Sequence, residues 1–404
     1  MHYYIFMESK TILSDPTSSS ADRTIWRIPA GIRFLAGKVR VGNFRIQNNS
    51  SLPVYFGTQG IYSLILRVSI LNLQGTEIDR LAGDALQLMA LRLMQAENAD
   101  QYSINRILAQ SMCNSVVLPS MSQKALTEQS GRDSATSLSA YIDISSMLKY
   151  LSVARNIIDE GMIVQLEWNA PSMVQNGFSF DRYPTLFYDE IISNLQADKG
   201  DVYTYPTIIT ERCSIPSPGA GAETASYQKR LNSLYAQYVQ NLYFYLLNDP
   251  QSDAPNPLNL AIAGKKESMS ISIDGRQLIP FSSINTASKK LAFLTDFFGP
   301  ITCTGLEAVY PGFRAYANFD SDANNYWGLK NVNTNTLYNG ILSYGAIKIA
   351  QFITNDITID YRVEVDLAAG QYATLVLMAE VVRTYTKSSG MVANLQLSPT
   401  VNTV

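Results

Sequence analysis

The stretch ITIDYRVEVDL, residues 357–367, decides the fold class, because its apolar and polar residues alternate without interruption. Every odd position from Ile357 to Leu367 is apolar or aromatic, and every even position carries Thr, Asp, Arg or Glu. A period of two puts the two sets on opposite faces of an extended chain. The stretch therefore predicts a β-strand with one buried and one solvated face, as is common in antiparallel sheets.

The same alternation predicts further strands in both halves of the chain. Residues 61–70, 161–170 and 267–275 each place apolar side chains on one face and mostly polar side chains on the other. Strands with one solvated face need a second layer that covers only the apolar face. The pattern therefore favours a mainly β protein made of packed antiparallel sheets.

Two stretches depart from simple alternation. In residues 38–47 (KVRVGNFRIQ) the apolar set changes face, which predicts a β-bulge at Gly42. Residues 372–390 (YATLVLMAEVVRTYTKSSG) begin with apolar side chains on both faces of an extended chain, interrupted at Glu380. Such a strand must be covered on nearly both sides, so we expect it to lie deep inside the fold.

Helical spacing is less frequent. Apolar residues three and four positions apart predict helices at residues 84–97, 144–161 and 286–299, and a longer one at residues 223–248. The segment 249–259 (DPQSDAPNPLN) follows the longest of these and is rich in proline. Its composition predicts a linker between a first β-unit and a shorter second one.

The composition argues against a basic nucleic-acid-binding arm and for a surface that contacts partners. The chain has 404 residues, of which 46% are hydrophobic and 16% are charged, and it contains 24 Tyr. Its net charge of −3, with one Lys and no Arg in residues 1–22, predicts no basic arm for neutralising nucleic acid. The low charge and the abundant Tyr suit a surface that is largely covered by partners.

The chain ends and the cysteines indicate where the protein is made. The N-terminal residues MHYYIFMESK lack the pattern of a signal peptide, and no apolar run is long enough to predict a transmembrane helix. The three cysteines Cys113, Cys213 and Cys303 are widely spaced and odd in number, so we expect reduced, structural thiols. We therefore expect assembly in the cytoplasm or nucleus of a cell, without secretion.

Few residues are candidates for catalysis or metal binding. The only histidine is His2, which excludes histidine-based triads and histidine metal sites. Residues 320–331 (DSDANNYWGLKN) begin like a calcium loop, but Asn325 stands in place of the required Gly and Asn331 in place of the bidentate Glu. A solvated loop is the better interpretation. We predict no catalytic residue, no cofactor site and no metal site.

Glu380 allows two interpretations. It is either a buried acid, or a residue at a point where the strand meets solvent or another subunit. The second is favoured because a lone acid is rarely buried completely. A glycosidase with paired carboxylates also stays open at this point, because any two of the 34 acidic residues can meet in space.

Four segments, taken in order along the chain, resemble the double jelly-roll major capsid proteins of tailless icosahedral, mostly double-stranded DNA, viruses. Residues 60–81 resemble an early strand pair of the first barrel, and residues 138–171 resemble its strand, short helix and strand. Residues 270–299 resemble the strand, turn and short helix of the second barrel, and residues 372–392 resemble its closing strand. Residues 184–221 fit the family pattern poorly.

The resemblance implies a mainly β fold, with two side-by-side eight-stranded antiparallel jelly-roll barrels (a double jelly roll) and a few helical insertions. Each barrel would consist of two packed sheets in Greek-key order. The expected parts are an N-terminal arm (1–22), a first barrel (23–222) with a helical insertion at 84–113, a connecting helix and Pro-rich linker (223–257), a second barrel (258–388) and a C-terminal arm (389–404).

The function that the resemblance implies is structural. Three chains would form a pseudo-hexameric homotrimer, and trimers would tile an icosahedral shell through lateral contacts. The implied partners are other copies of the chain, penton and minor capsid proteins, and an internal membrane in membrane-containing relatives, with no sequence-specific nucleic-acid binding. The implied location is the virion capsid. Two alternatives stay open: a carbohydrate-binding or glycan-hydrolysing β-sandwich protein, and a minor capsid or spike protein.

Overall fold

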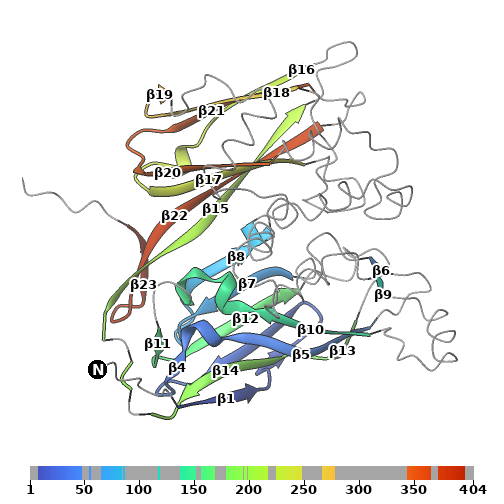
Figure 1. Cartoon of the computed structure of the whole chain (residues 1–404), viewed down its shortest axis with the longest axis vertical. Helices are drawn as coiled ribbons and strands as arrows, with labels where there is room; N and C mark the ends of the chain where they lie inside the picture. The colour runs from blue at the N-terminus through green and yellow to red at the C-terminus, as the bar shows by residue number, and fades with distance from the viewer. Residues whose placement is uncertain are drawn as a thin grey trace, which may run out of the picture. The chain divides into compact units, whose positions relative to one another are not determined.

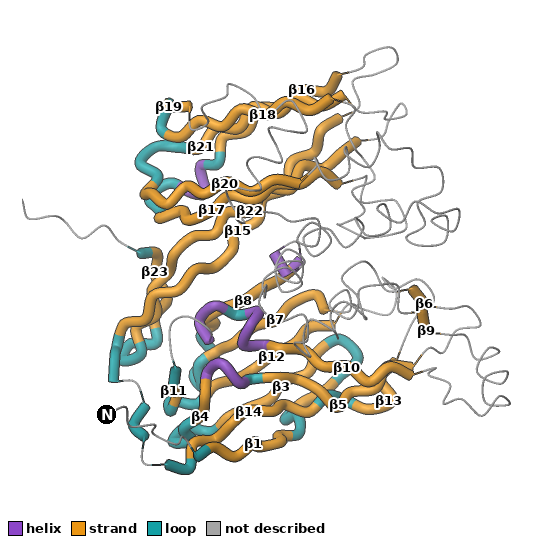
Figure 2. The backbone as a smooth tube through the Cα atoms, viewed as in Figure 1, coloured by secondary structure: helices purple, strands orange, loops and turns teal. Residues whose placement is uncertain are grey.

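A computed structural model of the chain contains mostly antiparallel β-sheet and few helices (Figures 1 and 2). The chain divides into two compact units. Unit 1 consists of residues 1–207 and 384–393, and unit 2 of residues 208–383 and 394–404. The residues described are 8–47, 54–55, 65–83, 85–86, 117–118, 137–151, 156–168, 179–193, 195–197, 199–216, 224–247, 266–277, 344–364 and 372–395.

Unit 1 contains two main sheets (Figure 1). The first has the strand order β1 (Ser9–Ser14), β14 (Thr185–Ile191), β5 (Arg40–Gln47) and β10 (Ser137–Asp143). The second has the order β3 (Arg23–Ile28), β12 (Met162–Trp168), β7 (Ile65–Leu71) and β8 (Glu77–Ala82). The remaining elements are short: β2 (Ser18–Ser19), β4 (Phe34–Leu35), η1 (Ala36–Lys38), β6 (Val54–Tyr55), β9 (Val117–Leu118), α4 (Ile144–Met147), β11 (Ile157–Ile158) and β13 (Ser179–Arg182).

Two tryptophans fix the core of unit 1. Trp168 in β12 is 1% exposed, and its indole N–H donates to the Thr24 hydroxyl at 2.9 Å. Its ring meets Phe180 of β13, in the other sheet, edge-on at 4.7 Å between centroids. Trp26 in β3 donates to the carbonyl of Pro184 at 3.2 Å. The two sheets are therefore joined by aromatic packing, with each indole N–H hydrogen-bonded.

The sequence patterns in unit 1 are confirmed at two places. In β12 the side chains alternate between buried and half-buried positions, as the period of two predicts. In β5 the pairing with β10 advances by three residues, from Val41 to Phe44, while β10 advances by two. The extra residue lies next to Gly42, and Asn43 there has a φ of 58°. This is the predicted bulge.

Unit 2 also contains two main sheets (Figure 1). One has the order β15 (Val202–Pro216), β22 (Tyr372–Thr386), β17 (Tyr238–Leu247) and β20 (Tyr344–Phe352), with β23 (Met391–Asn394) also paired to β22. The first residues of β15, the last residues of β22 and most of β23 belong to unit 1. The other has the order β16 (Thr224–Arg230), β21 (Ile357–Glu364), β18 (Lys266–Ile273) and β19 (Arg276–Gln277). A short helix, η4 (Asn232–Leu234), connects β16 to β17.

The two units share one strand order. In each, the first and last principal strands are neighbours in one sheet, and the second and seventh are neighbours in the other. Among the eight principal strands of each unit, consecutive strands pair within one sheet only at β7–β8 in unit 1 and at β18–β19 in unit 2. Connections that otherwise cross between two sheets are typical of Greek-key jelly rolls. Each unit therefore repeats the other's plan, although the sequence shows no strict repeat.

The core of unit 2 lies between its two sheets. It is built mainly from aliphatic residues of β17, β18, β20, β21 and β22, including Ile271, Ile359 and Leu377. Strand β22 is buried on both faces, as its composition predicts. Leu375, Leu377 and Ala379 are part of this core, and the opposite-face residues Val376 and Met378 have no exposed surface.

The predicted helix at residues 223–248 is wrong, and with it the connecting element expected at 223–257. Residues 224–230 form β16 and residues 238–247 form β17. The helical stripe arose because apolar residues of two strands and the intervening turn happen to be three to four positions apart. Aromatic and β-branched residues favour strands when neighbouring strands can pair with them, and β17 pairs on both sides.

Other predicted elements also need correction. The helix expected at 144–161 is confirmed in part. Helix α4 spans residues 144–147, with the Ser146 N–H donating to the capping Asp143 carboxylate at 3.2 Å, and residues 149–151 are also helical, but residues 157–158 form β11. The expected N-terminal arm contains β1, which pairs with β14, and the expected C-terminal arm contains β23. Apart from residues 85 and 86, the helices expected at 84–113 and 286–299 lie outside the described residues.

A charged side chain fastens one hairpin turn of unit 2 to the segment between β20 and β21. Asp274 and Gly275 both have positive φ angles, 49° and 75°, which suits the two-residue turn between β18 and β19. The Asp274 carboxylate accepts hydrogen bonds from the Thr354 hydroxyl at 2.5 Å and from the Asn355 N–H at 2.6 Å. The bond from the Thr354 side chain, supported by backbone N–H groups, lowers the pKa of Asp274.

Replacing Ile359 with Ala is expected to destabilise unit 2 by about 2–5 kcal/mol, because the side chain is fully buried opposite Ile271 and its loss leaves a cavity. Urea denaturation followed by circular dichroism measures the shift. Asp360→Ala, at the exposed next position of the same strand, is the matched control. Equal shifts for the two variants would contradict the assigned core.

Replacing Asp274 with Asn is expected to lower the stability of unit 2 at neutral pH and to have less effect in acid. A lowered folded-state pKa means that the carboxylate stabilises the fold above its unfolded value of about 3.9. That stabilisation is lost as the pH falls through the folded-state pKa. Urea midpoints of both proteins near pH 7 and at about pH 2.5 test this. A difference that stayed constant across this range would refute it.

Candidate functional site

Buried or clustered polar side chains are the candidates for chemistry in this structure. Three groups stand out among the described residues: Glu380 in unit 2, an Arg67-centred network in unit 1, and a cluster around Lys387 in unit 1. Each is positioned by β-strands or by the turns that join them. Their partners and burial decide whether they have the properties of an active site.

Glu380 is a buried acid, which corrects the favoured interpretation that it faces solvent or a subunit. It is 4% exposed within a single chain. Its carboxylate accepts hydrogen bonds from the Asn241 amide at 2.5 Å and from the Tyr243 hydroxyl at 2.9 Å, both on the neighbouring strand β17. These donors offset the cost of burying the acid. Glu380 therefore ties β22 to β17.

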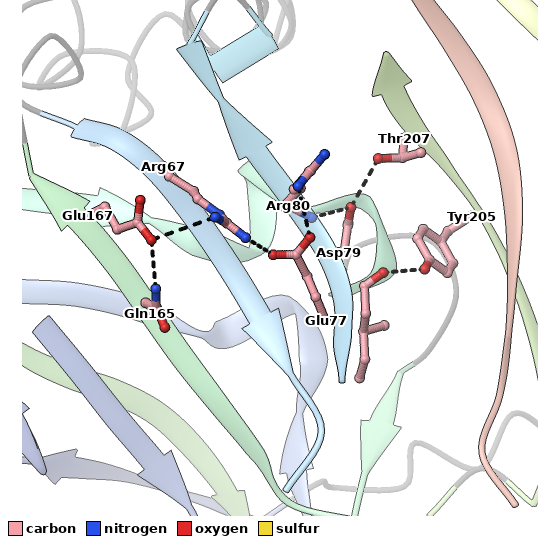
Figure 3. Close-up of polar contacts among 9 residues, drawn as sticks. Arg67, Glu77, Asp79, Arg80, Gln165, Glu167, Tyr205 and Thr207 are labelled. Carbon is pink, nitrogen blue, oxygen red and sulfur yellow. Dashed lines mark hydrogen bonds and ion pairs between the residues drawn. The ribbon is translucent and has the colours of Figure 1, made fainter. Parts of the chain in front are cut away.

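The second group is a ladder of charges across β8, β7 and β12 (Figure 3). Arg67 is paired with Glu77 on one side and lies 3.7 Å from Glu167 on the other. Arg80 pairs with Glu77 at 3.4 Å, and the Gln165 amide donates to Glu167 at 2.8 Å. Two carboxylates near one another could serve a glycosidase. Here an arginine lies between them and neutralises both, as is usual on a half-exposed strand face.

Asp79 lies beside this ladder but is buried (Figure 3). Its carboxylate accepts the Tyr150 N–H at 3.0 Å and the Arg80 N–H at 2.9 Å, and the Thr207 hydroxyl lies at 3.5 Å. The Tyr205 hydroxyl donates to the carbonyl of Ile78, the residue that precedes Asp79. Backbone N–H groups bonded to a carboxylate stabilise its charged form. Asp79 thus fastens β8 to the segment after α4.

The third group surrounds Lys387, in the turn between β22 and β23. The Lys387 ammonium lies 2.7 Å from Asp159 and 3.5 Å from Glu160. The next residue, Ser388, donates to Asp201. Several of these side chains line an open pocket of about 610 Å³ in unit 1. Mixed charges and hydrogen bonds of this kind can hold a turn in place.

The described residues contain no group of three or more His, Cys, Asp or Glu side chains able to hold a metal ion. In the same part of the chain, no helix has the length and apolar character needed to cross a membrane. Of the residues considered in the sequence, Cys213 is a free, buried thiol in the core of unit 2. His2, Cys113, Cys303 and the loop 320–331 lie outside the described residues.

Sequence reasoning missed the clusters around Asp79 and Lys387. The Lys387–Asp159 contact joins positions 228 residues apart, and the Tyr150–Asp79 contact joins positions 71 residues apart. Local patterns report the period of a strand but give no information about which distant strand lies beside it. The adjacent acids Asp159 and Glu160 were the one available signal, and adjacent acids are common in turns.

Replacing Glu380 with Ala is expected to destabilise unit 2 by about 2–3 kcal/mol, because donors on the half-buried Asn241 and the buried Tyr243 lose their acceptor. Glu380→Gln, which keeps an acceptor oxygen and the side-chain shape, is expected to have a smaller effect. Urea denaturation of both variants measures the difference. If Ala and Gln were equally tolerated, the carboxylate would have no role in joining β22 to β17.

Solved structures resemble this chain along nearly its whole length. VP54 of PBCV-1, as fitted into a cryo-EM reconstruction of the virophage Sputnik, matches with a TM-score of 0.53 and 11% identity over 98% of this chain and 99% of that chain. The mavirus major capsid protein matches with a TM-score of 0.49 and 9% identity over 96% of this chain and 91% of that chain. A chain in the Sputnik virophage structure has a TM-score of 0.49 and 9% identity, with 98% and 91% covered.

No family model matches the sequence, and no curated protein is similar to it. At 11% identity, the likeness with a TM-score of 0.53 concerns the fold alone. The fold that this chain shares with VP54 confirms the resemblance to double jelly-roll capsid proteins that was predicted from the sequence. This chain is therefore similar in fold to the double jelly-roll capsid proteins.

Proposed function

We propose that this chain is a major capsid protein that builds an icosahedral viral shell. The observation that carries the proposal is the repetition of one jelly-roll strand order in both units of a single chain. A β-sandwich enzyme or lectin needs only one such unit. A chain that carries two equivalent units is suited to a lattice in which units of similar shape occupy neighbouring positions.

The expected oligomer follows from this duplication. Three chains around a threefold axis place six similar units in a ring, which gives a pseudo-hexameric outline suited to tiling. Each unit would be an eight-stranded barrel, the first made of β1, β3, β5, β7, β8, β10, β12 and β14, and the second of β15 to β22. In this proposal the boundary lies at residues 207–208, in place of the linker expected at 223–257.

The polar clusters support a structural role over a catalytic one. Glu380 and Asp79 are buried and accept hydrogen bonds from groups that join neighbouring strands. The paired acids Glu77 and Glu167 share Arg67 between them. In each case the acid has a packing or pairing role that needs no substrate. The proposed mechanism is therefore assembly without chemistry.

The proposed partners and location follow from the capsid role. The chain would contact other copies of itself within trimers and between trimers, together with penton and minor capsid proteins and, in a membrane-containing virion, an internal membrane. Its location would be the capsid of the virion, after assembly in the host cytoplasm or nucleus. No cofactor, metal ion or sequence-specific nucleic-acid contact is part of the proposal.

Negative-stain electron microscopy of the purified chain tests this proposal. Hexagonal trimers or closed shells are expected. Small monomeric particles that bind or hydrolyse glycans would instead support a β-sandwich carbohydrate protein. Isolated pentamers or fibres would support a minor capsid or spike protein. Either of these last two outcomes would overturn the assignment.

Replacing Leu13 with Asp is expected to weaken self-association by about tenfold or more, because contacts between copies would bury this apolar side chain. Leu13 is 57% exposed on the edge strand β1, so the single chain loses little packing. Analytical ultracentrifugation measures the association, and the urea midpoint checks the fold. The control is Lys38→Asp, at an exposed position in the same unit. Unchanged association for Leu13→Asp would exclude this edge from the interface.

A further inference from the structure

We propose that residues 384–393 form a clasp that completes unit 1, so that the packing of unit 1 depends on a segment made after residues 208–383 of unit 2. Unit 1 takes its first part from residues 1–207 and its last part from residues 384–393. The intervening residues 208–383 belong to unit 2. The inference concerns this conformational dependence and stands apart from the proposed capsid function.

The clasp contributes a side chain to a cluster of four tyrosines in unit 1. Tyr150, at its centre, has no exposed surface and meets Tyr203 and Tyr205 edge-on. Tyr385 is 2% exposed and meets Tyr150 edge-on at 5.6 Å between centroids, with the rings at 89°. Edge-to-face pairs of this geometry are favourable beyond the area they bury. Without residue 385, Tyr150 would lose one wall of its site.

An ion pair next to the tyrosine cluster also joins the clasp to the rest of unit 1. The Lys387 ammonium lies 2.7 Å from Asp159 and 3.5 Å from Glu160, just before β12. The Tyr150 hydroxyl donates to Glu160 at 3.1 Å, which links the ion pair to the tyrosine cluster. The Lys387 and Asp159 side chains are 30% and 37% exposed, so solvent partly screens their attraction, whereas Glu160 is 14% exposed.

Hydrogen bonds to one aspartate fix the backbone of the clasp. The Lys387 N–H donates to the Asp201 carbonyl at 2.7 Å. The Ser388 N–H and hydroxyl donate to the two carboxylate oxygens of Asp201, each at 2.7 Å. Bonds from one residue to both carboxylate oxygens set the orientation of the turn as well as its position. The turn is therefore held by side chain and main chain together.

These contacts are among the most distant in the sequence. Lys387 and Asp159 are 228 residues apart, and Ser388 and Asp201 are 187 apart. Contacts of high sequence separation form slowly, because the entropy of closing a long loop opposes them. During synthesis, residues 1–207 emerge before residues 384–393. The final packing around Tyr150 is thus expected to wait for the clasp.

Hydrogen exchange with mass spectrometry on the full chain tests the clasp. Lys387→Glu is expected to raise amide exchange in residues 150–168 and 201–207 at least about tenfold, while exchange in residues 266–277 of unit 2 stays unchanged. Adding Asp159→Lys to Lys387→Glu restores an opposite-charge pair and is expected to recover most of the protection. Lys38→Glu makes the same charge change at an exposed site and is expected to change neither region.

Two further measurements keep the inference open to refutation. If Lys387→Glu yields no soluble protein, Ser388→Ala, which removes one hydrogen bond, replaces it in the test. This variant is expected to raise amide exchange in the same residues by a smaller factor. Pulse-labelled exchange during refolding of the wild-type chain is expected to protect residues 150–168 together with residues 385–388. Full protection of residues 150–168 before residues 385–388, or unchanged exchange in the variants, would overturn the proposal.

Discussion

Strand β22 is paired along both edges, with β15 and β17 (Figure 1). Its side chains from Leu375 to Val382 are buried on both faces. A strand in this position cannot tolerate polar residues unless each finds a partner, because unpaired polar groups in a core are costly. Its residues therefore serve the core of unit 2 on one face and remain apolar on the other, except at Glu380. The neighbouring strand β17 supplies the donors that this acid requires. Strand β22 therefore receives its backbone pairing from β15 and β17, and its buried acid receives its hydrogen bonds from β17.

In unit 1 several of the buried polar groups belong to aromatic side chains. Its two sheets meet through Trp26 and Trp168, whose polar N–H groups are satisfied by a carbonyl and a hydroxyl. A second aromatic group, centred on Tyr150, gathers residues from the segment after α4, from β15 and from β22. Large rings bury much area and place a polar tip where a partner can reach it. The high tyrosine content of the chain is used here inside the fold, whereas composition alone had suggested surface contacts.

The sequence was most informative where one face of a strand is buried. Alternation predicted β12, β18 and β21, and a change of face predicted the bulge at Gly42, because these signals are local. Local patterns failed at residues 223–248, where two strands and a turn imitate the spacing of a helix. They also failed at β1, whose short and mixed sequence becomes a strand through pairing with β14. The acid Glu380 was found in the sequence, but its burial depends on neighbours that no local pattern describes.

The division of unit 1 between two distant parts of the chain has a consequence for proteolysis. A single cut anywhere in residues 208–383 would produce two fragments, each of which retains a piece of unit 1. The contacts of Tyr385, Lys387 and Ser388 would then act between fragments in place of a peptide bond. Such a nicked molecule would migrate as one species under native conditions and separate into two bands only after denaturation. The non-covalent contacts of residues 385–388 therefore hold the two parts of unit 1 together even where the backbone between them is cut.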